Sequence, residues 1–392
     1  MPYPLLTEAE ILPRDGFSGA LAARVFRPEV RGPAIAAIRA DGVFDVTGVF
    51  PTMRDLAETE NPAAALRAAP GERIGGLADI VANTPPDARD AKIPWLLAPI
   101  DLQAIKAAGV TFVTSMLERV IEERARGNPE SAVRIRAEMG RLVGEDLRAL
   151  KPGSPQAERV KAALIVEGAW SQYLEVGIGP DAEIFTKAQP MSVVGCGADA
   201  GFHASSQWSN PEPEAVLIVA SDGRIVGATL GNDVNLRDFE GRSALLLGKA
   251  KDQNASAALG PFVRFFDATF SLDDVRAMEI ALDIEGEDGF RLEGRSSMRE
   301  ISRDPADLVA QLIGPHHAYP DGAALYLGTM FAPVKDRDAP GKGFTHKIGD
   351  IVTVGSEKLG RLVNRMRFAH DCARWEFGTS ALMRNLAQRG LL

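Results

Sequence analysis

The stretch that decides the fold of this chain, residues 210–238, reads NPEPEAVLIVASDGRIVGATLGNDVNLRD. Two apolar, β-rich runs flank the dipeptide Asp222-Gly223, which is a strong short-range signal for a β-hairpin. With that dipeptide as the turn, the numbers of facing residues add up to 445. Glu212 then lies opposite Asp233, and Glu214 projects from the same face because side chains alternate along a strand. The stretch therefore predicts a hairpin that gathers three carboxylates.

Three carboxylates on one patch of sheet predict a bound cation. At about 5 Å and an effective dielectric constant near 20, each carboxylate pair repels by about 3 kcal/mol. A protein that gathers three such groups either protonates some of them or binds a cation. Ligation by oxygen alone favours a hard ion such as Mg²⁺, Mn²⁺ or Ca²⁺. The geometry alone leaves the choice among these three ions open.

Two other interpretations of this hairpin remain open. The acids are solvated side chains at the entrance of a strand, or the register slips by one residue and sends Asp233 to the opposite face. The uninterrupted apolar run over residues 215–220 argues against the first, because such a run predicts a strand that is buried on both faces.

Composition narrows the class of protein. The chain has 392 residues, of which 45% are hydrophobic and 25% are charged, as in an ordinary globular protein of two or more structural units. Its net charge of −9 disfavours a nucleic-acid or anionic-membrane partner. We see no secretory signal and no apolar run long enough to span a membrane, and we expect a cytoplasmic protein. Cys196 and Cys372 are far apart and predict buried free thiols.

The spacing of turns and apolar runs predicts two domains. Residues 1–95 mix short β-like pieces with helices and form a small α/β domain. Residues 96–392 form the larger domain, which begins with a short helix over residues 101–107. A helical insertion or lid occupies residues 115–170 or so, and short strands separated by turns continue from residue 183 to about residue 363.

Several side chains outside the hairpin are candidates for chemistry. Lys251 follows a short basic segment and precedes a Gly-Pro turn, so it could return past the carboxylates and act as a base. Glu118 and Glu183 are candidate general acids, and Thr329, at the glycine-marked end of a strand, is a candidate ligand contact. The alternative for Lys251 and Glu118 is a solvated surface side chain.

The motifs resemble those of the fumarylacetoacetate hydrolase superfamily. The resemblance rests on NPEPEAVLIV, GNDVNLRDFEG and LGKAKDQNASAALGP, continues through Gly328-Thr329 and GDIV, and covers about residues 95–390. Segments such as AGVTF, WSQYLEV and GPDAEIFTK are most similar to the dehydratases of 2-keto-3-deoxy-pentonates, in particular of 2-keto-3-deoxy-D-xylonate. The implied fold class is α+β: a mixed β-roll catalytic domain, a smaller N-terminal α/β domain and a helical lid.

This resemblance assigns roles to individual residues. It implies Glu212, Glu214 and Asp233 as the ligands of a Mg²⁺ cofactor, with Mn²⁺ as the alternative ion. It also implies Lys251 as the base, Glu183 as a further acid and Thr329 as a substrate contact. Ser115, Lys187 and Asn232 are expected to bind substrate as well, and Glu118 to close over the site. The expected partner is a small 2-keto-3-deoxy sugar acid, and family members are commonly dimers or tetramers, so we expect a homo-oligomer.

One departure from the family pattern bears on the reaction. Hydrolases of the superfamily that cleave C–C bonds carry a His and, three residues later, a Glu that together activate water; the matching residues here are Ser115 and Glu118. A serine hydroxyl is a far poorer base than an imidazole, so the departure favours dehydration to 2,5-dioxopentanoate. The alternatives are an acylpyruvate or diketo-acid hydrolase that uses the same metal, and a non-catalytic metal-binding protein.

Overall fold

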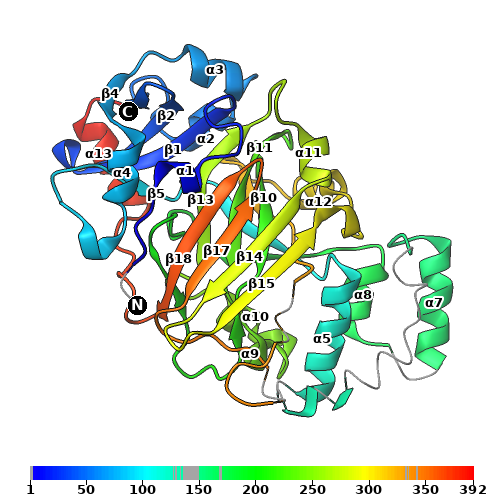
Figure 1. Cartoon of the computed structure of the whole chain (residues 1–392). Helices are drawn as coiled ribbons and strands as arrows, with labels where there is room; N and C mark the ends of the chain where they lie inside the picture. Colours follow the sequence, from blue (N-terminus) through cyan, green and yellow to red (C-terminus); the bar gives the residue numbers. More distant parts are fainter. Residues whose placement is uncertain are drawn as a thin grey trace.

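A computed structural model describes residues 3–126, 150–166, 170–331 and 343–392, together with 128, 130–132, 134, 135, 333 and 335–340. Its largest sheet has eleven strands, ten of them in the order β4-β3-β2-β1-β13-β11-β10-β16-β6-β7, with β5 paired to β1. A second sheet has the order β15-β14-β17-β18-β8, and β12 and β9 form a short ladder. The mixed α+β fold expected from the sequence is confirmed (Figure 1).

The elements follow one another along the chain as three groups. The N-terminal group comprises α1 (Glu8–Ile11), β1 (Ala20–Arg27), β2 (Gly32–Arg39), β3 (Gly42–Asp45), α2 (Met53–Ala57), α3 (Pro62–Ala68), β4 (Glu72–Gly75), α4 (Leu77–Ala82) and β5 (Trp95–Leu97). The middle group comprises β6 (Ala104–Gly109), α5 (Val113–Ala125), α7 (Pro155–Val166), α8 (Gln172–Ile178), β7 (Glu183–Ala188), β8 (Asp199–Phe202), β9 (Ser209–Asn210), β10 (Pro213–Val219), β11 (Ile225–Asp233), β12 (Asn235–Leu236), α9 (Arg237–Glu240) and α10 (Leu247–Lys251). The last group comprises β13 (Ala257–Phe265), α11 (Leu272–Arg276), β14 (Glu279–Glu285), β15 (Arg291–Ser297), α12 (Pro305–Leu312), β16 (Ala323–Tyr326), β17 (Ile351–Ser356), β18 (Gly360–Phe368) and α13 (Thr379–Gln388).

The central hairpin has the predicted register but a different turn. Strands β10 and β11 pair Pro213 with Asn232, so facing residue numbers add up to 445 as predicted. The turn nevertheless has three residues, because the amide of Ala220 bonds to the carbonyl of Arg224, and Gly223 takes a positive φ of 87°. A bulge between Ile218 and Val219 restores the register. The longer turn and the bulge therefore offset each other.

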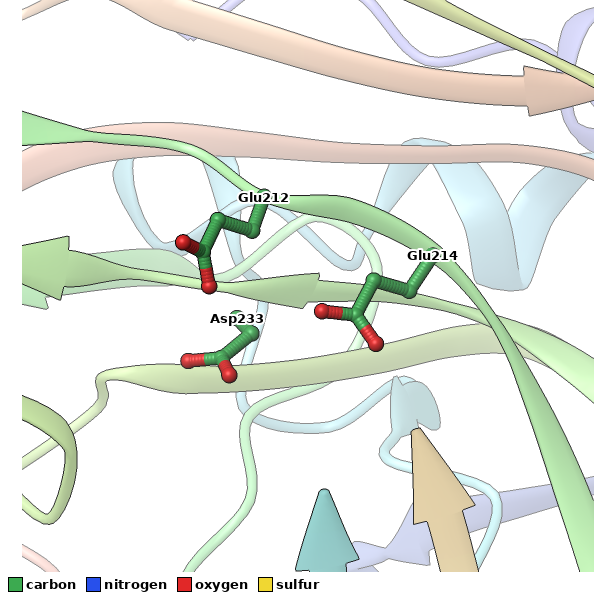
Figure 2. A group of neighbouring side chains, drawn as sticks. All are labelled: Glu212, Glu214 and Asp233. Atoms are coloured by element: carbon green, nitrogen blue, oxygen red, sulfur yellow. The ribbon is translucent and has the colours of Figure 1, made fainter. Parts of the chain in front are cut away.

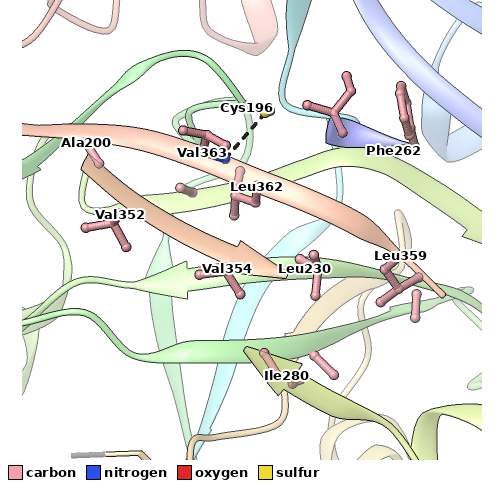
Figure 3. Packing of buried hydrophobic residues seen from close by; sticks show 14 of the residues in the cluster. Cys196, Ala200, Leu230, Phe262, Ile280, Val352, Val354, Leu359, Leu362 and Val363 are labelled. Atoms are coloured by element: carbon pink, nitrogen blue, oxygen red, sulfur yellow. Dashed lines mark hydrogen bonds between the residues drawn. The ribbon is translucent and has the colours of Figure 1, made fainter. Parts of the chain in front are cut away.

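Strand β10 is buried on both faces, as its apolar run predicts. Ala215, Leu217 and Val219 belong to one hydrophobic cluster. The alternating residues Val216, Ile218 and Ala220 belong to a second cluster. Figure 3 shows the first cluster, where side chains of β11, β13, β14, β17 and β18 meet between the two larger sheets. Glu212 and Glu214, at the start of β10, and Asp233, at the end of β11, are thus attached to buried strands.

One expected element is wrong. The sequence predicts a short helix over residues 101–107, but Ala104–Gly109 form β6, which pairs parallel to β16 and antiparallel to β7. The alanine-rich segment has a good helix propensity, yet its pairing with the buried strand β16 and with β7 overrides that local preference.

The N-terminal part shares its sheet with the larger part. Strand β1 pairs with β13, and β5, at the expected boundary near residue 95, pairs with β1. Helix α13 returns to the N-terminal strands (Figure 1), where Asn385 Nδ2 donates to the carbonyl of Val30 at 2.8 Å. The division into two domains stays a prediction.

Helices α5, α7 and α8 stand beside the sheets at one side of the molecule (Figure 1). Met116, Val120 and Ile121 of α5 pack with Tyr173 and Leu174 of α8 in a hydrophobic cluster separate from the two sheet cores. The middle of the expected insertion, residues 136–149, lies outside the described residues. The helical cluster faces the end of the sheet where the acids lie, since Ser115, Arg119 and Tyr173 contribute to the same cavity as those acids.

Two further expectations from composition can be compared with the structure. Cys196 and Cys372 are free and buried, as predicted. Among the described residues, no helix has the length and apolar character needed to span a membrane.

Candidate metal centre

Three buried carboxylates converge where β10 and β11 meet. Glu212, Glu214 and Asp233 each offer an oxygen, and these oxygens lie within 4.8 Å of one another. Figure 2 shows the two glutamates projecting from one strand toward the aspartate of its neighbour. The Asp233 amide donates to the Glu212 carbonyl at 3.0 Å, so the predicted facing pair is present. The geometric prediction of an acidic cluster is confirmed.

The electrostatics of the cluster fit a hard divalent cation. Burial raises the pKa of Glu214 well above its ordinary value, and the charges of Asp233 and Glu212 raise it further. Glu214 Oε2 accepts a hydrogen bond from the amide of Gly328 at 2.6 Å, which fixes its orientation. Three oxygen donors that oppose each other's ionisation at such short range are the set that Mg²⁺ or Mn²⁺ prefers.

Two lysines neutralise part of this negative charge. The Lys251 ammonium, at the end of α10, bonds to Glu212 Oε2 and, at 3.0 Å, to Asp233 Oδ2. Burial lowers the pKa of Lys251, but the carboxylates of Asp233, Glu212 and Glu240 outweigh burial and raise it. Lys187 Nζ lies 2.9 Å from Asp233 Oδ1. Although burial raises the pKa of Asp233, these two ammonium groups lower it overall.

The acids open into a small cavity of about 50 Å³. This volume accommodates an ion with a few water molecules. The cavity is lined by all three acids and by four of the other residues that the sequence singled out, Ser115, Glu183, Lys251 and Thr329. The hydroxyl of Ser115 donates to the carbonyl of Phe112 at 2.9 Å, and the Thr329 hydroxyl accepts from the amide of Phe331 at 3.1 Å.

Glu183 enters the cavity at the start of β7, opposite a glycine. It pairs with Gly109 of β6, and a Cβ at residue 109 would overlap Glu183 Oε2. Burial raises the pKa of Glu183, while Arg119 and Lys251 oppose that shift. A raised pKa favours the protonated carboxyl group, which is the form that a general acid needs.

Three expected site residues do not line the cavity. Glu118 Oε2 bonds instead to Arg237 Nη2 at 3.0 Å. Lys187 is fully buried, and its ammonium bonds to the carbonyls of Lys251 and Val234. The side chain of Asn232 accepts from the amide of Glu212 at 3.2 Å. The structure therefore gives Lys187 and Asn232 positions that support Asp233 and Glu212, and it turns Glu118 toward α9.

Sequence reasoning missed three residues of the cavity wall. Arg119 donates to Glu212 Oε1 at 2.7 Å and also bonds to Glu240. Burial raises the pKa of Glu240 to about 7, although Arg119 opposes the shift. The Tyr173 hydroxyl lies 3.5 Å from the carbonyl of Glu240. The available signal was that Ser115 and Arg119, four residues apart, share one face of a helix.

Comparisons with known proteins relate part of this chain to one family and most of it to a known fold. Residues 184–367, which include all three acids, match the family model for the fumarylacetoacetate (FAA) hydrolase C-terminal domain. A 2-dehydro-3-deoxy-D-arabinonate dehydratase of Saccharolobus solfataricus is 31% identical over 47% of this chain and 58% of the relative. A probable 2-keto-3-deoxyxylonate dehydratase of Haloferax volcanii is 31% identical over 49% of this chain and 62% of the relative. The chain thus spans less than two thirds of the length of either curated relative.

Solved structures extend the likeness to the fold of most of the chain. The apo form of 2-keto-3-deoxy-D-arabinonate dehydratase covers 89% of this chain and 99% of its own, with a TM-score of 0.61 and 21% identity. The structure of that dehydratase in complex with magnesium and 2,5-dioxopentanoate also covers 89% of this chain and 99% of its own, with a TM-score of 0.60 and 21% identity. Residues 184–367 therefore resemble the fumarylacetoacetate (FAA) hydrolase C-terminal domain in sequence, and most of the chain shares the fold of these dehydratase structures.

Proposed function

We propose that this chain is a Mg²⁺- or Mn²⁺-dependent hydro-lyase that converts a 2-keto-3-deoxy-pentonate into water and the semialdehyde 2,5-dioxopentanoate. The proposal rests on one observation: Glu212, Glu214, Asp233 and Lys251 line the same cavity, where the Lys251 ammonium bonds to Glu212 and Asp233. The curated relatives named above are dehydratases of such acids, and one structure of similar fold holds magnesium and 2,5-dioxopentanoate.

Glu212, Glu214 and Asp233 would hold the cation. When bound, the ion supplies polarisation of the C2 carbonyl and stabilises negative charge at its oxygen. Lys251 is placed to remove a proton from C3, because its ammonium lies between two of the three acids. A base must be neutral, and a cation that engages the same carboxylates withdraws the charges that raise the pKa of Lys251.

Glu183 is placed to protonate the leaving hydroxyl at C4. Its carboxyl group lines the cavity, and burial raises its pKa. Thr329 and Ser115 face the same cavity and would contact substrate oxygens. In this scheme Lys187 and Asn232 hold Asp233 and Glu212 in place.

The proposed substrate is the D-acid 2-keto-3-deoxy-D-xylonate. D-xylonate and D-arabinonate differ only at C2 and C3, and neither carbon is a stereocentre in the 2-keto-3-deoxy acid. A 2-keto-3-deoxy-D-arabinonate and a 2-keto-3-deoxy-D-xylonate are therefore the same compound, in which C4 alone is chiral.

A C–C hydrolase of acylpyruvates is the competing function. It needs a group that activates water, and among the described residues that line the cavity none is a histidine. Glu118, the surviving half of the hydrolase pair, is bonded to Arg237. Both observations favour dehydration.

The experiment incubates the purified chain and Mg²⁺ with 2-keto-3-deoxy-D-xylonate and, separately, with an acylpyruvate, and follows the products by NMR. Semialdehyde from the first substrate, lost on chelation of the metal and restored by Mg²⁺, is the expected result. Pyruvate from the second substrate without semialdehyde from the first would overturn the proposal. Mg²⁺-dependent thermal stabilisation with no turnover of either would support a metal-binding protein instead.

A further inference from the structure

The proposed dehydration leaves one chemical step without a residue. Loss of the C4 hydroxyl from the C3 carbanion gives 5-hydroxy-2-oxopent-3-enoate, whose double bond joins C3 and C4. To reach the 5-aldehyde, one proton must leave C5 and one must leave the C5 hydroxyl, and one proton must be added at each of C3 and C4. Lys251 and Glu183 serve C3 and the C4 oxygen, so C5 needs a second base that lines the same cavity.

Glu240 lies where such a base is needed. It ends α9, is 5% exposed and contributes to the cavity wall. Its Oε1 is 3.8 Å from Lys251 Nζ, whereas Asp233 Oδ2 is 3.0 Å from that same nitrogen. Lys251 thus stands between an acid of the metal cluster and Glu240. A substrate whose keto-acid end would lie at the three acids and whose C3 would lie at Lys251 would extend its C5 end toward the remaining wall.

Arg119 fixes the orientation of this carboxylate. Its Nη1 bonds to Glu240 Oε2, and its Nη2 donates to Glu212 Oε1 at 2.7 Å. A guanidinium group stays protonated in proteins and does not exchange protons with substrate. Arg119 therefore positions Glu240, and Glu240 transfers the proton. One oxygen of Glu240 is held by Arg119, and the other is directed to the Lys251 side of the cavity.

From this geometry, and resting on the proposed function, we propose that Glu240 is a catalytic acid-base residue that moves the C5 proton of the enone intermediate. The Glu240 carboxylate takes a proton from C5, and the electron pair of that C5–H bond forms the C4=C5 double bond. The electron pair of the former C3=C4 double bond then takes a proton at C3 from Lys251, which holds the proton that it removed from C3 earlier. The product of this step is 5-hydroxy-2-oxopent-4-enoate. Protonation of C4 by Glu240, with loss of the enol proton to Glu183 directly or through water, gives 2,5-dioxopentanoate and restores all three residues.

The experiment compares Glu240→Gln with Glu122→Gln. Glutamine keeps the shape of the side chain and can accept a hydrogen bond from Arg119, but it cannot take a proton. Glu122 is a matched control, because it is 3% exposed, bonds to Arg119 Nη1 at 2.9 Å and does not line the cavity. Three processes are followed by NMR in D₂O: exchange of the C3 protons, appearance of the enone and formation of the semialdehyde.

We expect Glu240→Gln to keep C3 exchange within about threefold of wild type and to accumulate the enone, while semialdehyde formation falls by roughly 10²-fold or more. Added 5-hydroxy-2-oxopent-3-enoate should be isomerised by wild type and by Glu122→Gln but not by Glu240→Gln. The thermal shift produced by Mn²⁺ alone should match wild type in both variants, which shows that the site still folds and binds metal.

Two outcomes would overturn the role of Glu240. One is semialdehyde formation by Glu240→Gln at the wild-type rate. The other is equal loss of C3 exchange and of semialdehyde, which would make Glu240 a residue that positions Lys251. Failure of the proposed function looks different, because wild type itself would then leave the 2-keto-3-deoxy acid unchanged.

Discussion

Gly109 and Glu183 face each other across β6 and β7, and the absence of a side chain at residue 109 is what lets the Glu183 carboxyl group reach the cavity. Glycine is used here for space, since the Glu183 oxygen occupies the volume that a Cβ would fill. A carboxyl group that is buried in this way keeps its raised pKa only while it stays in that position.

The first prediction follows from this contact. Gly109→Ala should displace Glu183 and reduce turnover of the 2-keto-3-deoxy acid by roughly 10²-fold, the usual contribution of one general acid. Gly48→Ala is the control, because a Cβ there meets no atom within 4 Å. Steady-state kinetics with thermal shifts in Mg²⁺ would check both variants. Full turnover by Gly109→Ala would exclude Glu183 as the acid.

The second prediction concerns Lys251. Lys251→Met should abolish turnover, since it removes the base, and retain Mg²⁺ binding, since it keeps all three acids. Without Mg²⁺ the variant should lose about 3 kcal/mol of unfolding free energy, because Glu212 and Asp233 lose a buried counter-charge. Urea unfolding with and without Mg²⁺ measures this loss. Turnover within tenfold of wild type would contradict the assignment.

The third prediction is a pH dependence of metal binding. The pKa of Glu214 is raised, so the folded chain keeps a proton that the unfolded chain has released above the ordinary carboxyl pKa of about 4.3. The contribution of Glu214 to the free energy of unfolding therefore falls as pH rises. A cation that replaces the proton of Glu214 binds more tightly at higher pH. Calorimetry over a series of pH values above about 4.3 should show rising Mg²⁺ affinity and proton release. Affinity independent of pH would contradict this role of Glu214.

The fourth prediction tests the proposed preference for dehydration over C–C hydrolysis. Restoring the family imidazole with Ser115→His should not create acylpyruvate hydrolysis, because Glu118 remains bonded to Arg237 and cannot orient the ring. The assay is pyruvate release from an acylpyruvate. Release at a rate above that of wild type would show that the serine alone determines the reaction.

The hairpin could be predicted from sequence because its signals are local. Alternation along a strand decides which side chains share a face, so the register that the apolar pattern predicts is enough to bring Glu212, Glu214 and Asp233 together. The sequence did not reveal that a three-residue turn and a bulge produce this register, since both leave the apolar pattern unchanged.

The helical side of the site was harder to predict. Glu118 and Arg119 are adjacent on α5, and a small rotation of the helix about its axis decides which one reaches the cavity. That rotation is set by how Met116 and Val120 pack with α8, which is tertiary information. Lys187 and Asn232 were placed in the right neighbourhood, but only the packing behind Asp233 and Glu212 shows that they face those acids.

The offset between turn and bulge in the central hairpin constrains how this gene can change. A single codon lost from the turn, with the bulge retained, would shift β10 by one residue against β11 and rotate Glu212 and Glu214 away from Asp233. A change of turn length is tolerated only when the bulge at Ile218 disappears or appears with it. Among natural relatives, an insertion or deletion in the turn should therefore occur together with one at the bulge. Such paired changes would be visible in the lengths of the turn and of the strand, and not in which amino acids occupy them.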